Sequence, residues 1–142
     1  MGVTIKCKKT GRDIDLGYGG FMQLRNKVAE LQGGLFWEHY EGIAKCPFVG
    51  YARKQYFAAF DRRTAELIQQ KKVSEKIVDF LLQPDAGGSI HYGACKAILK
   101  VIGDYDDDIC YGYSGRSDCA MFRDFKAILQ DCVENKCDMV WL

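Results

Sequence analysis

Apolar and polar residues alternate at both ends of the chain, which is the pattern of a strand with one buried face. Residues 3–8 (VTIKCK) alternate in this way, and residues 13–16 (DIDL) repeat the pattern after a short turn. These two runs predict a β-hairpin. Residues 137–142 (CDMVWL) form a third alternating run, and we expect this strand to pair into the same sheet.

Between these ends the apolar residues recur every three or four positions, which is the spacing of helices with one buried face. Ser74 is a typical N-cap for one of them. The pattern predicts a single α+β domain over residues 1–142, with a small antiparallel sheet from the N-terminal hairpin and the C-terminal strand packed with four or five helices. The expected helices cover residues 21–31, 49–72, 75–82, 94–102 and 121–133, and the short aromatic segment 35–43 (LFWEHYEGI) also has helical spacing.

The composition is that of a globular protein, with 48% hydrophobic and 27% charged residues. The net charge is +1, from 20 basic and 19 acidic side chains, without the basic excess of duplex nucleic acid binders. We therefore expect no duplex nucleic acid partner. Charge interrupts the apolar residues after Met1 at once, and no run has the length of a membrane span. We expect no export signal, no membrane partner and a cytoplasmic location.

The seven cysteines are odd in number and scattered, so a disulfide framework is a poor explanation for them. Reduced, mostly buried thiols fit the absence of an export signal better. The sequence has no C-x-x-C motif, and Cys132 and Cys137 have no histidine nearby, so it predicts no metal site. The acidic residues 104–108 (DYDDD) lack the glycine and glutamate that an EF-hand loop requires at its sixth and twelfth positions.

A glycine-rich turn at residues 17–20 leads directly into a predicted helix. The dinucleotide-binding fingerprint G-x-G-x-x-G fails here, because Met22 stands at the third glycine position. What remains is a helix N-terminus with unpaired N–H groups, which attracts an anion. The alternative is a tight corner that serves only strand–helix packing.

Residues 111–117 (YGYSGRS) form a second predicted turn rich in glycine and tyrosine, and this turn also contains arginine and serine side chains that can bind a ligand. Tyrosine rings offer flat faces to a base or a sugar, and an arginine offers a fork to a phosphate. The alternative is that the rings pack over the corner while Arg116 pairs with Asp118 or the acidic residues. The residues assigned to a ligand site are Tyr18, Gly19, Gly20, Arg25, Tyr92, Tyr111, Tyr113, Ser114, Arg116 and Ser117.

The segments IDLGYGGF and QLRNKVAEL, followed by DYDD, YGYSGRSDCAMFRDFK and a terminal MVWL, resemble a group of small proteins from bacteriophages and prophages of Gram-positive gut bacteria. The resemblance spans the whole chain. It implies a cytoplasmic protein of infected cells and carries over no catalytic residues. Compact non-enzymatic phage proteins often act by binding a host protein or by sequestering a nucleotide signal.

The leading hypothesis is a non-enzymatic phage binding protein, an antagonist of host defence that sequesters a small anionic ligand such as a nucleotide. It needs no cofactor and no catalytic residue. One alternative is a protein-interaction module that inhibits a host protein through an aromatic surface around Phe36, Trp37 and Tyr40. The other is a small enzyme that uses His91 or a cysteine, since His91 lies four positions before Cys95. The sequence also leaves room for a homo-oligomer.

Overall fold

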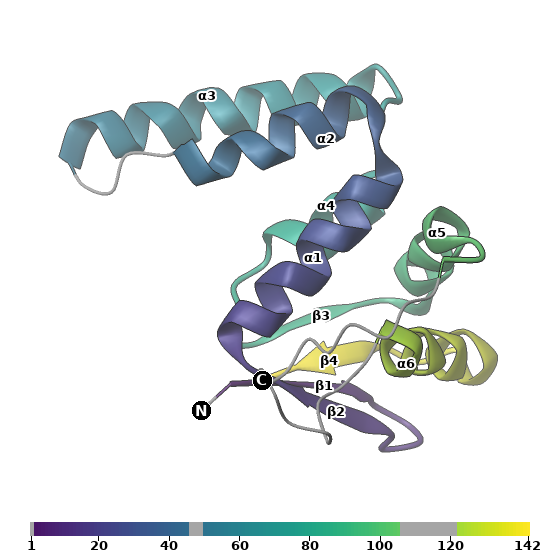
Figure 1. The fold of residues 1–142 in the computed structure, drawn as a ribbon. Coiled ribbons are helices and arrows are strands. Elements are labelled where there is room, and N and C mark those ends of the chain that lie inside the picture. Colours follow the sequence, from purple (N-terminus) through teal and green to yellow (C-terminus); the bar gives the residue numbers. More distant parts are fainter. Residues whose placement is uncertain (1, 46–49, 106–121) are drawn as a thin grey trace.

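A computed structural model describes residues 2–45, 50–105 and 122–142 of the chain. Within these ranges the predicted α+β class is confirmed, with a four-stranded antiparallel sheet and six α-helices (Figure 1). The elements in chain order are β1 (Val3–Cys7), β2 (Asp13–Leu16), α1 (Tyr18–Gln32), α2 (Gly34–Glu41), a 3-10 turn (Gly42–Lys45), α3 (Gly50–Gln69), α4 (Glu75–Leu82), β3 (Gly88–Ile90), α5 (Tyr92–Ile102), α6 (Phe122–Asn135) and β4 (Met139–Trp141).

The sheet has the strand order β2-β1-β4-β3, so the C-terminal strand lies inside it (Figure 1). Strand β4 pairs with β1 through Trp141 opposite Ile5 and Met139 opposite Cys7. On its other side it pairs with β3, where Ile90 lies opposite Met139. The predicted hairpin and terminal strand are therefore confirmed, and they join the two ends of the chain.

Strand β3 is the element that the sequence pattern misses, because residues 87–89 predict only a turn before a helix. Gly88 packs so closely against the indole of Trp141 that a Cβ atom would overlap the ring, and glycine allows this contact. The Gln83 side chain accepts from the Ser89 N–H at 3.1 Å and donates to the Ser89 carbonyl oxygen at 2.7 Å. These contacts add a short edge strand to the sheet.

Helix α1 begins directly after Gly17, so residues 17–20 are the start of the helix and not a turn before it. The Phe21 N–H donates to the Gly17 carbonyl oxygen at 2.9 Å, which opens the helical ladder. The helix ends as predicted at Gly33 and Gly34, whose φ angles of 67° and 62° lie in the left-handed region that favours glycine.

The later helices begin at side-chain caps. Ser74 caps α4 as predicted, since its hydroxyl accepts from the Lys76 N–H at 3.2 Å. His91 caps α5, with its Nδ1 accepting from the Gly93 N–H at 3.2 Å. Both caps satisfy backbone donors that the helix itself leaves unpaired.

Trp141 is the largest fully buried side chain of the core. Its ring centroid lies 5.8 Å from that of Phe21 in α1 and 5.8 Å from that of Phe80 in α4. The indole Nε1–H donates to the Pro84 carbonyl oxygen at 3.0 Å, so the polar end of the ring is also satisfied. Two helices are thus set against the sheet by one side chain of β4.

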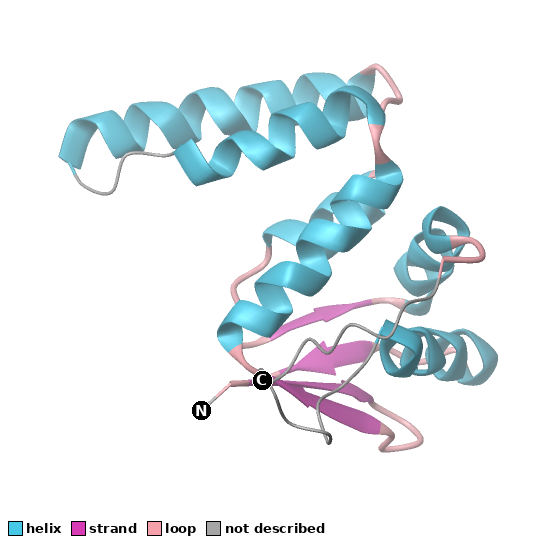
Figure 2. Ribbon diagram, in the orientation of Figure 1, coloured by secondary structure: helices cyan, strands magenta, loops and turns pink. Residues whose placement is uncertain are grey.

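Helices α2 and α3 run side by side as a hairpin that extends away from the sheet (Figures 1 and 2). Helix α3 has 20 residues, of which Phe60, Thr64 and Leu67 are buried. At the base of the hairpin, the Gln32 side chain donates to the Lys72 carbonyl oxygen at 3.2 Å, which ties the end of α1 to the segment before α4. Most of α3 therefore faces solvent.

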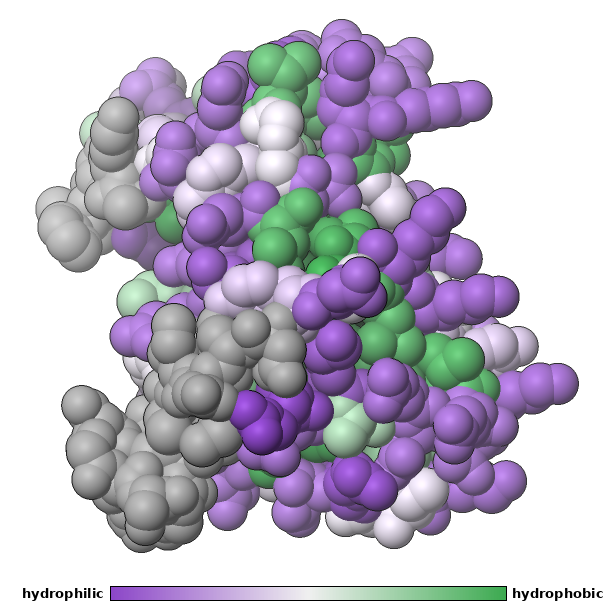
Figure 3. Space-filling model, turned by 45° about the vertical axis from the view of Figure 1, so that its right-hand side comes forward, coloured by the Kyte–Doolittle hydropathy of each residue, from purple (hydrophilic) through white to green (hydrophobic). Residues whose placement is uncertain are grey.

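Hydrophilic side chains cover most of the face shown in Figure 3, and hydrophobic ones gather in a band across its middle. Among the described residues, Tyr51 and Leu142 are the most exposed large hydrophobic side chains, at 74% and 76%. In the described ranges no helix combines the length and the apolar character that crossing a membrane requires.

We predict that Trp141→Ala lowers the free energy of unfolding by about 3–5 kcal/mol, because it removes the ring on which α1 and α4 pack. Leu142→Ala is the matched control, since the neighbouring side chain is 76% exposed and its loss should change stability by no more than about 0.5 kcal/mol. Denaturant unfolding followed by circular dichroism measures both. Equal effects of the two replacements would show that β4 does not anchor the core.

Candidate functional site

One face of helix α3 packs against α2, and the stacking of an imidazole on an aromatic ring holds the two helices together. The His39 ring stacks on Phe60 with 4.1 Å between the ring centroids. The Thr64 hydroxyl donates to the Phe60 carbonyl oxygen at 2.9 Å, so it accepts from His39 Nε2 at 2.9 Å. Burial, and then the charge of Arg63, lower the pKa of His39 and favour the neutral ring in this contact.

A second face of α3 carries an open groove of about 750 Å³. Within the described part of the chain, every lining residue comes from α3. The lining positions recur at a spacing of three and four residues, so they share one side of the helix. We call this surface the α3 groove, and it is lined by Gly50, Tyr51, Arg53, Lys54, Phe57, Ala58 and Asp61.

The α3 groove combines aromatic rings with cations. The guanidinium carbon of Arg53 lies 5.0 Å from the centroid of the Phe57 ring, within the range of a cation–π interaction. Tyr51 is 74% exposed and Lys54 is exposed beside it. Tyrosine and arginine are among the residues that contribute most binding energy at protein interfaces, and phenylalanine is enriched in interface cores. The groove therefore has the composition of a protein-binding surface.

The charge of α3 is positive overall, because the helix carries four basic and two acidic side chains, a net charge of +2. One of these cations, Arg63, pairs with Glu66 at 3.1 Å. The sequence predicts this helix but not its groove, because periodicity identifies the buried face without showing whether another element covers a second face. The sequence offered one signal for the groove: Tyr51 and Phe57 are aromatic residues that lie outside the apolar positions predicted to be buried.

The first half of the ligand site predicted from sequence divides between two helix starts. Tyr18, Gly19 and Gly20 lie in the first turn of α1, where Tyr18 is 46% exposed. Tyr92 lies in the first turn of α5, and its ring centroid is 4.1 Å from that of the capping His91.

Strand register places these two helix starts at opposite ends of the sheet. Helix α1 follows Leu16, which pairs with Val3 at the start of β1. Helix α5 follows Ile90, which pairs with Met139, and Met139 pairs with Cys7 at the end of β1. The structure therefore does not bring Tyr18 and Tyr92 together.

Arg25, the third described part of that predicted site, lies in the core instead of at the surface. Its side chain is 7% exposed, and Nη1 donates to the Asp85 carboxylate at 2.9 Å. Its guanidinium lies 4.2 Å from the Phe21 ring centroid, while its Nε and Nη2 have no hydrogen-bond partner among the described residues. Burial lowers the pKa of Arg25, and Asp85 counteracts this. The physical reason is that position 25 lies on the same buried stripe as Phe21 and Leu24.

The other half of the predicted ligand site lies outside the described residues. This holds for the acidic residues 106–108 as well. A ligand site at the second turn therefore stays a prediction, and it comprises Tyr111, Tyr113, Ser114, Arg116 and Ser117.

The structure also places the residues of the two alternative hypotheses. Phe36 is fully buried and Tyr40 is 6% exposed, while Trp37 is partly buried, so the aromatic surface expected around them is mostly core. Cys95 is fully buried and the Nδ1 atom of His91 caps α5. A buried thiol and an occupied imidazole nitrogen are a poor nucleophile–base pair.

No protein-family model, no curated protein and no solved structure matches this chain. The functional argument therefore begins with the geometry of the described residues. Within them, the α3 groove unites exposure, aromatic rings and charge on one surface.

We predict opposite responses of Arg25 and Asp85 to replacement. Arg25→Met removes a buried charge whose Nε and Nη2 have no hydrogen-bond partner in the described ranges, and it keeps apolar volume among aromatic rings, so the free energy of unfolding should change by less than about 1 kcal/mol. Asp85→Ala leaves that charge buried without its partner and should cost about 2–3 kcal/mol. Urea unfolding measures both variants. A larger loss with Arg25→Met than with Asp85→Ala would show that the buried charge itself is needed.

Proposed function

We propose that this protein is a non-enzymatic interaction module of a bacteriophage that binds a host protein through the α3 groove and thereby inhibits it. The observation that carries this proposal is the exposure of α3, a helix of 20 residues with three buried. A long helix held on one side by a shorter one leaves a whole face for a partner. That face holds the exposed Tyr51 and the cation–π pair of Arg53 and Phe57.

A protein partner suits this surface better than a small molecule does. Small-molecule sites usually enclose most of their ligand within a concave pocket. The described lining of the α3 groove comes from one helix, which can contact a ligand from one side only. Capture of a small anion near Tyr18 in the first turn of α1 remains the second proposal, supported by the exposed ring at a helix N-terminus.

The chemistry of the groove indicates the kind of partner. Rings at positions 51 and 57 suit apolar side chains that recur along one face of a partner helix. Arg53 and Lys54 beside them suit carboxylates at the rim of the contact. The partner we propose is therefore an amphipathic helix with an acidic edge, displayed by a host protein.

The resemblance to small phage proteins supports the biological setting of this proposal. It gives an infected bacterium as the place of action and its cytoplasm as the compartment. It also supports inhibition as the outcome of binding, because compact phage proteins without catalytic residues often act by occupying a host factor.

The test is affinity capture of host proteins with the intact chain and four variants. Tyr51→Ala and Lys54→Glu alter the groove, and Tyr18→Ala and Lys96→Glu are matched controls on other helices. Tyr18 and Tyr51 both lie in the first turn of a helix, and Lys54 and Lys96 are both exposed. For a captured host protein, each groove variant should weaken the measured affinity by about tenfold or more.

The controls should leave that affinity within about twofold of the intact protein. Equal binding by the groove variants and the intact chain would contradict the proposal. A thermal-shift panel of nucleotides provides a separate readout for the second proposal. Stabilisation by a nucleotide that Tyr18→Ala abolishes, without any groove-dependent protein partner, would favour ligand capture instead.

A further inference from the structure

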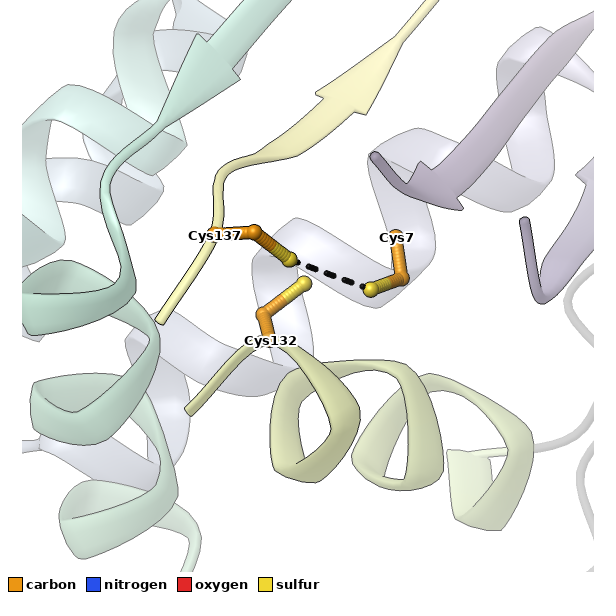
Figure 4. Close-up of side chains that lie close together, drawn as sticks. All are labelled: Cys7, Cys132 and Cys137. Atoms are coloured by element: carbon orange, nitrogen blue, oxygen red, sulfur yellow. Dashed lines mark hydrogen bonds between the residues drawn. The ribbon is translucent and has the colours of Figure 1, made fainter. Parts of the chain in front are cut away.

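The structure gathers three cysteines that the sequence keeps far apart. Cys7 ends β1, Cys132 lies in the last turns of α6, and Cys137 lies in the segment between α6 and β4. Their sulfur atoms all lie within 4.8 Å of one another, and those of Cys7 and Cys137 are 3.3 Å apart (Figure 4). Figure 4 shows the three side chains pointing toward a common centre.

Hydrogen-bonded backbone holds each of the three positions. Cys7 lies opposite Met139 in the β1–β4 ladder, which places the segment before β4 beside the end of β1. The Cys137 N–H donates to the Cys132 carbonyl oxygen at 3.1 Å, and Lys136 between them has a φ of 49° that reverses the chain. The cluster is therefore built into the fold before any ligand binds.

The separations match the dimensions of a thiolate metal site. Zinc binds thiolates at about 2.3 Å in tetrahedral geometry, which places pairs of sulfur atoms about 3.8 Å apart. The cluster has one separation of 3.3 Å and an upper limit of 4.8 Å, so this value lies inside the observed range. Shifts of less than about 1 Å would bring all three sulfur atoms onto one ion.

We propose that Cys7, Cys132 and Cys137 bind a thiophilic divalent metal ion, Zn²⁺, through their three sulfur atoms. Cys7 and Cys132 are fully buried and Cys137 is partly exposed. The ion therefore enters, and a water molecule completes its tetrahedron, on the side of Cys137. Bound in this way, the ion joins β1, α6 and the segment that leads into β4, independently of any partner at α3.

The surroundings of Cys7 favour its thiolate, whereas those of Cys132 and Cys137 favour the thiol in the absence of a metal ion. Burial raises the pKa of Cys7, but hydrogen bonds from the side chain and backbone of Thr10 and from Cys137 outweigh it and lower that pKa from 9.0 to about 7. A hydrogen bond with Cys95 and burial raise the pKa of Cys132, and burial raises that of Cys137. A divalent cation stabilises all such thiolates and releases their protons.

A disulfide between Cys7 and Cys137 is the competing chemistry. It would need the sulfur atoms to move from 3.3 Å to about 2.05 Å and would leave Cys132 unused. It would also consume an oxidant, whereas metal binding requires none. The two outcomes are distinguishable, because a disulfide removes two thiols from the count and a metal ion does not.

The experiment uses the full chain, prepared metal-free in a non-thiol reductant and titrated with Co²⁺ and then Zn²⁺. We expect one Co²⁺ per chain, a thiolate-to-cobalt charge-transfer band, tetrahedral visible bands, and their loss on addition of Zn²⁺. Cys137→Ser should weaken Zn²⁺ binding by roughly 100-fold or more, because it removes a ligand and not merely a supporting contact. Cys95→Ala is the comparison, because Cys95 hydrogen-bonds to Cys132 without being one of the three gathered cysteines, so its loss should retain the cobalt bands and weaken Zn²⁺ binding less than Cys137→Ser does.

Cys137 is chosen because its side chain is partly exposed, so its serine variant should fold. Circular dichroism of the metal-free variant verifies this, and Cys7→Ser provides a second variant. Absence of cobalt bands from the reduced protein would overturn the proposal, as would unchanged metal binding by Cys137→Ser, which would assign the metal to other cysteines. A thiol count lowered by two in the untreated protein, with no metal bound, would establish the disulfide instead.

Discussion

The packing of Trp141 is the interaction on which the rest of the structure depends. Strand β4 lies between β1 and β3, so its single tryptophan meets the sheet, α1 and α4 together. Gly88 leaves room for the indole in β3, and Pro84 accepts its N–H. Helix α1 leads into the α2–α3 hairpin and α4 follows it. The Gln32 side chain, at the end of α1, bonds to Lys72 before α4 and so ties the two ends of the hairpin together. The position of the α3 groove therefore follows from a side chain in the last strand.

Most of the fold could be predicted from the sequence, because local patterns determine it. Alternation identified the hairpin and β4, and Ser74 marked the start of α4. Strand β3 could not be found this way, since its three residues include one large apolar side chain and its pairing depends on Trp141. The burial of Arg25 could not be predicted either, since an arginine on a helix is usually exposed, whereas here an aromatic cluster and Asp85 accommodate it.

The candidate sites were harder to predict, because both depend on contacts between distant parts of the chain. Cys7 and Cys137 are 130 positions apart, and only the β1–β4 register brings their sulfur atoms to 3.3 Å. Spacing rules for metal ligands do not reach that far. The α3 groove exists because no other described element covers that face of α3. The periodicity of the sequence does not show which helix face is left uncovered. Helix α2 covers one face through His39 and leaves Tyr51 exposed.

Hydrogen–deuterium exchange of the protein alone and bound to its captured host partner tests the central claim most directly, because it locates the contact without any substitution. The account predicts slower exchange on binding for the amides of residues 50–61, at the start of α3. The amides of residues 17–20, in the first turn of α1, should exchange at an unchanged rate. Slower exchange at residues 17–20 with no change in α3 would contradict the assignment of binding to the α3 groove.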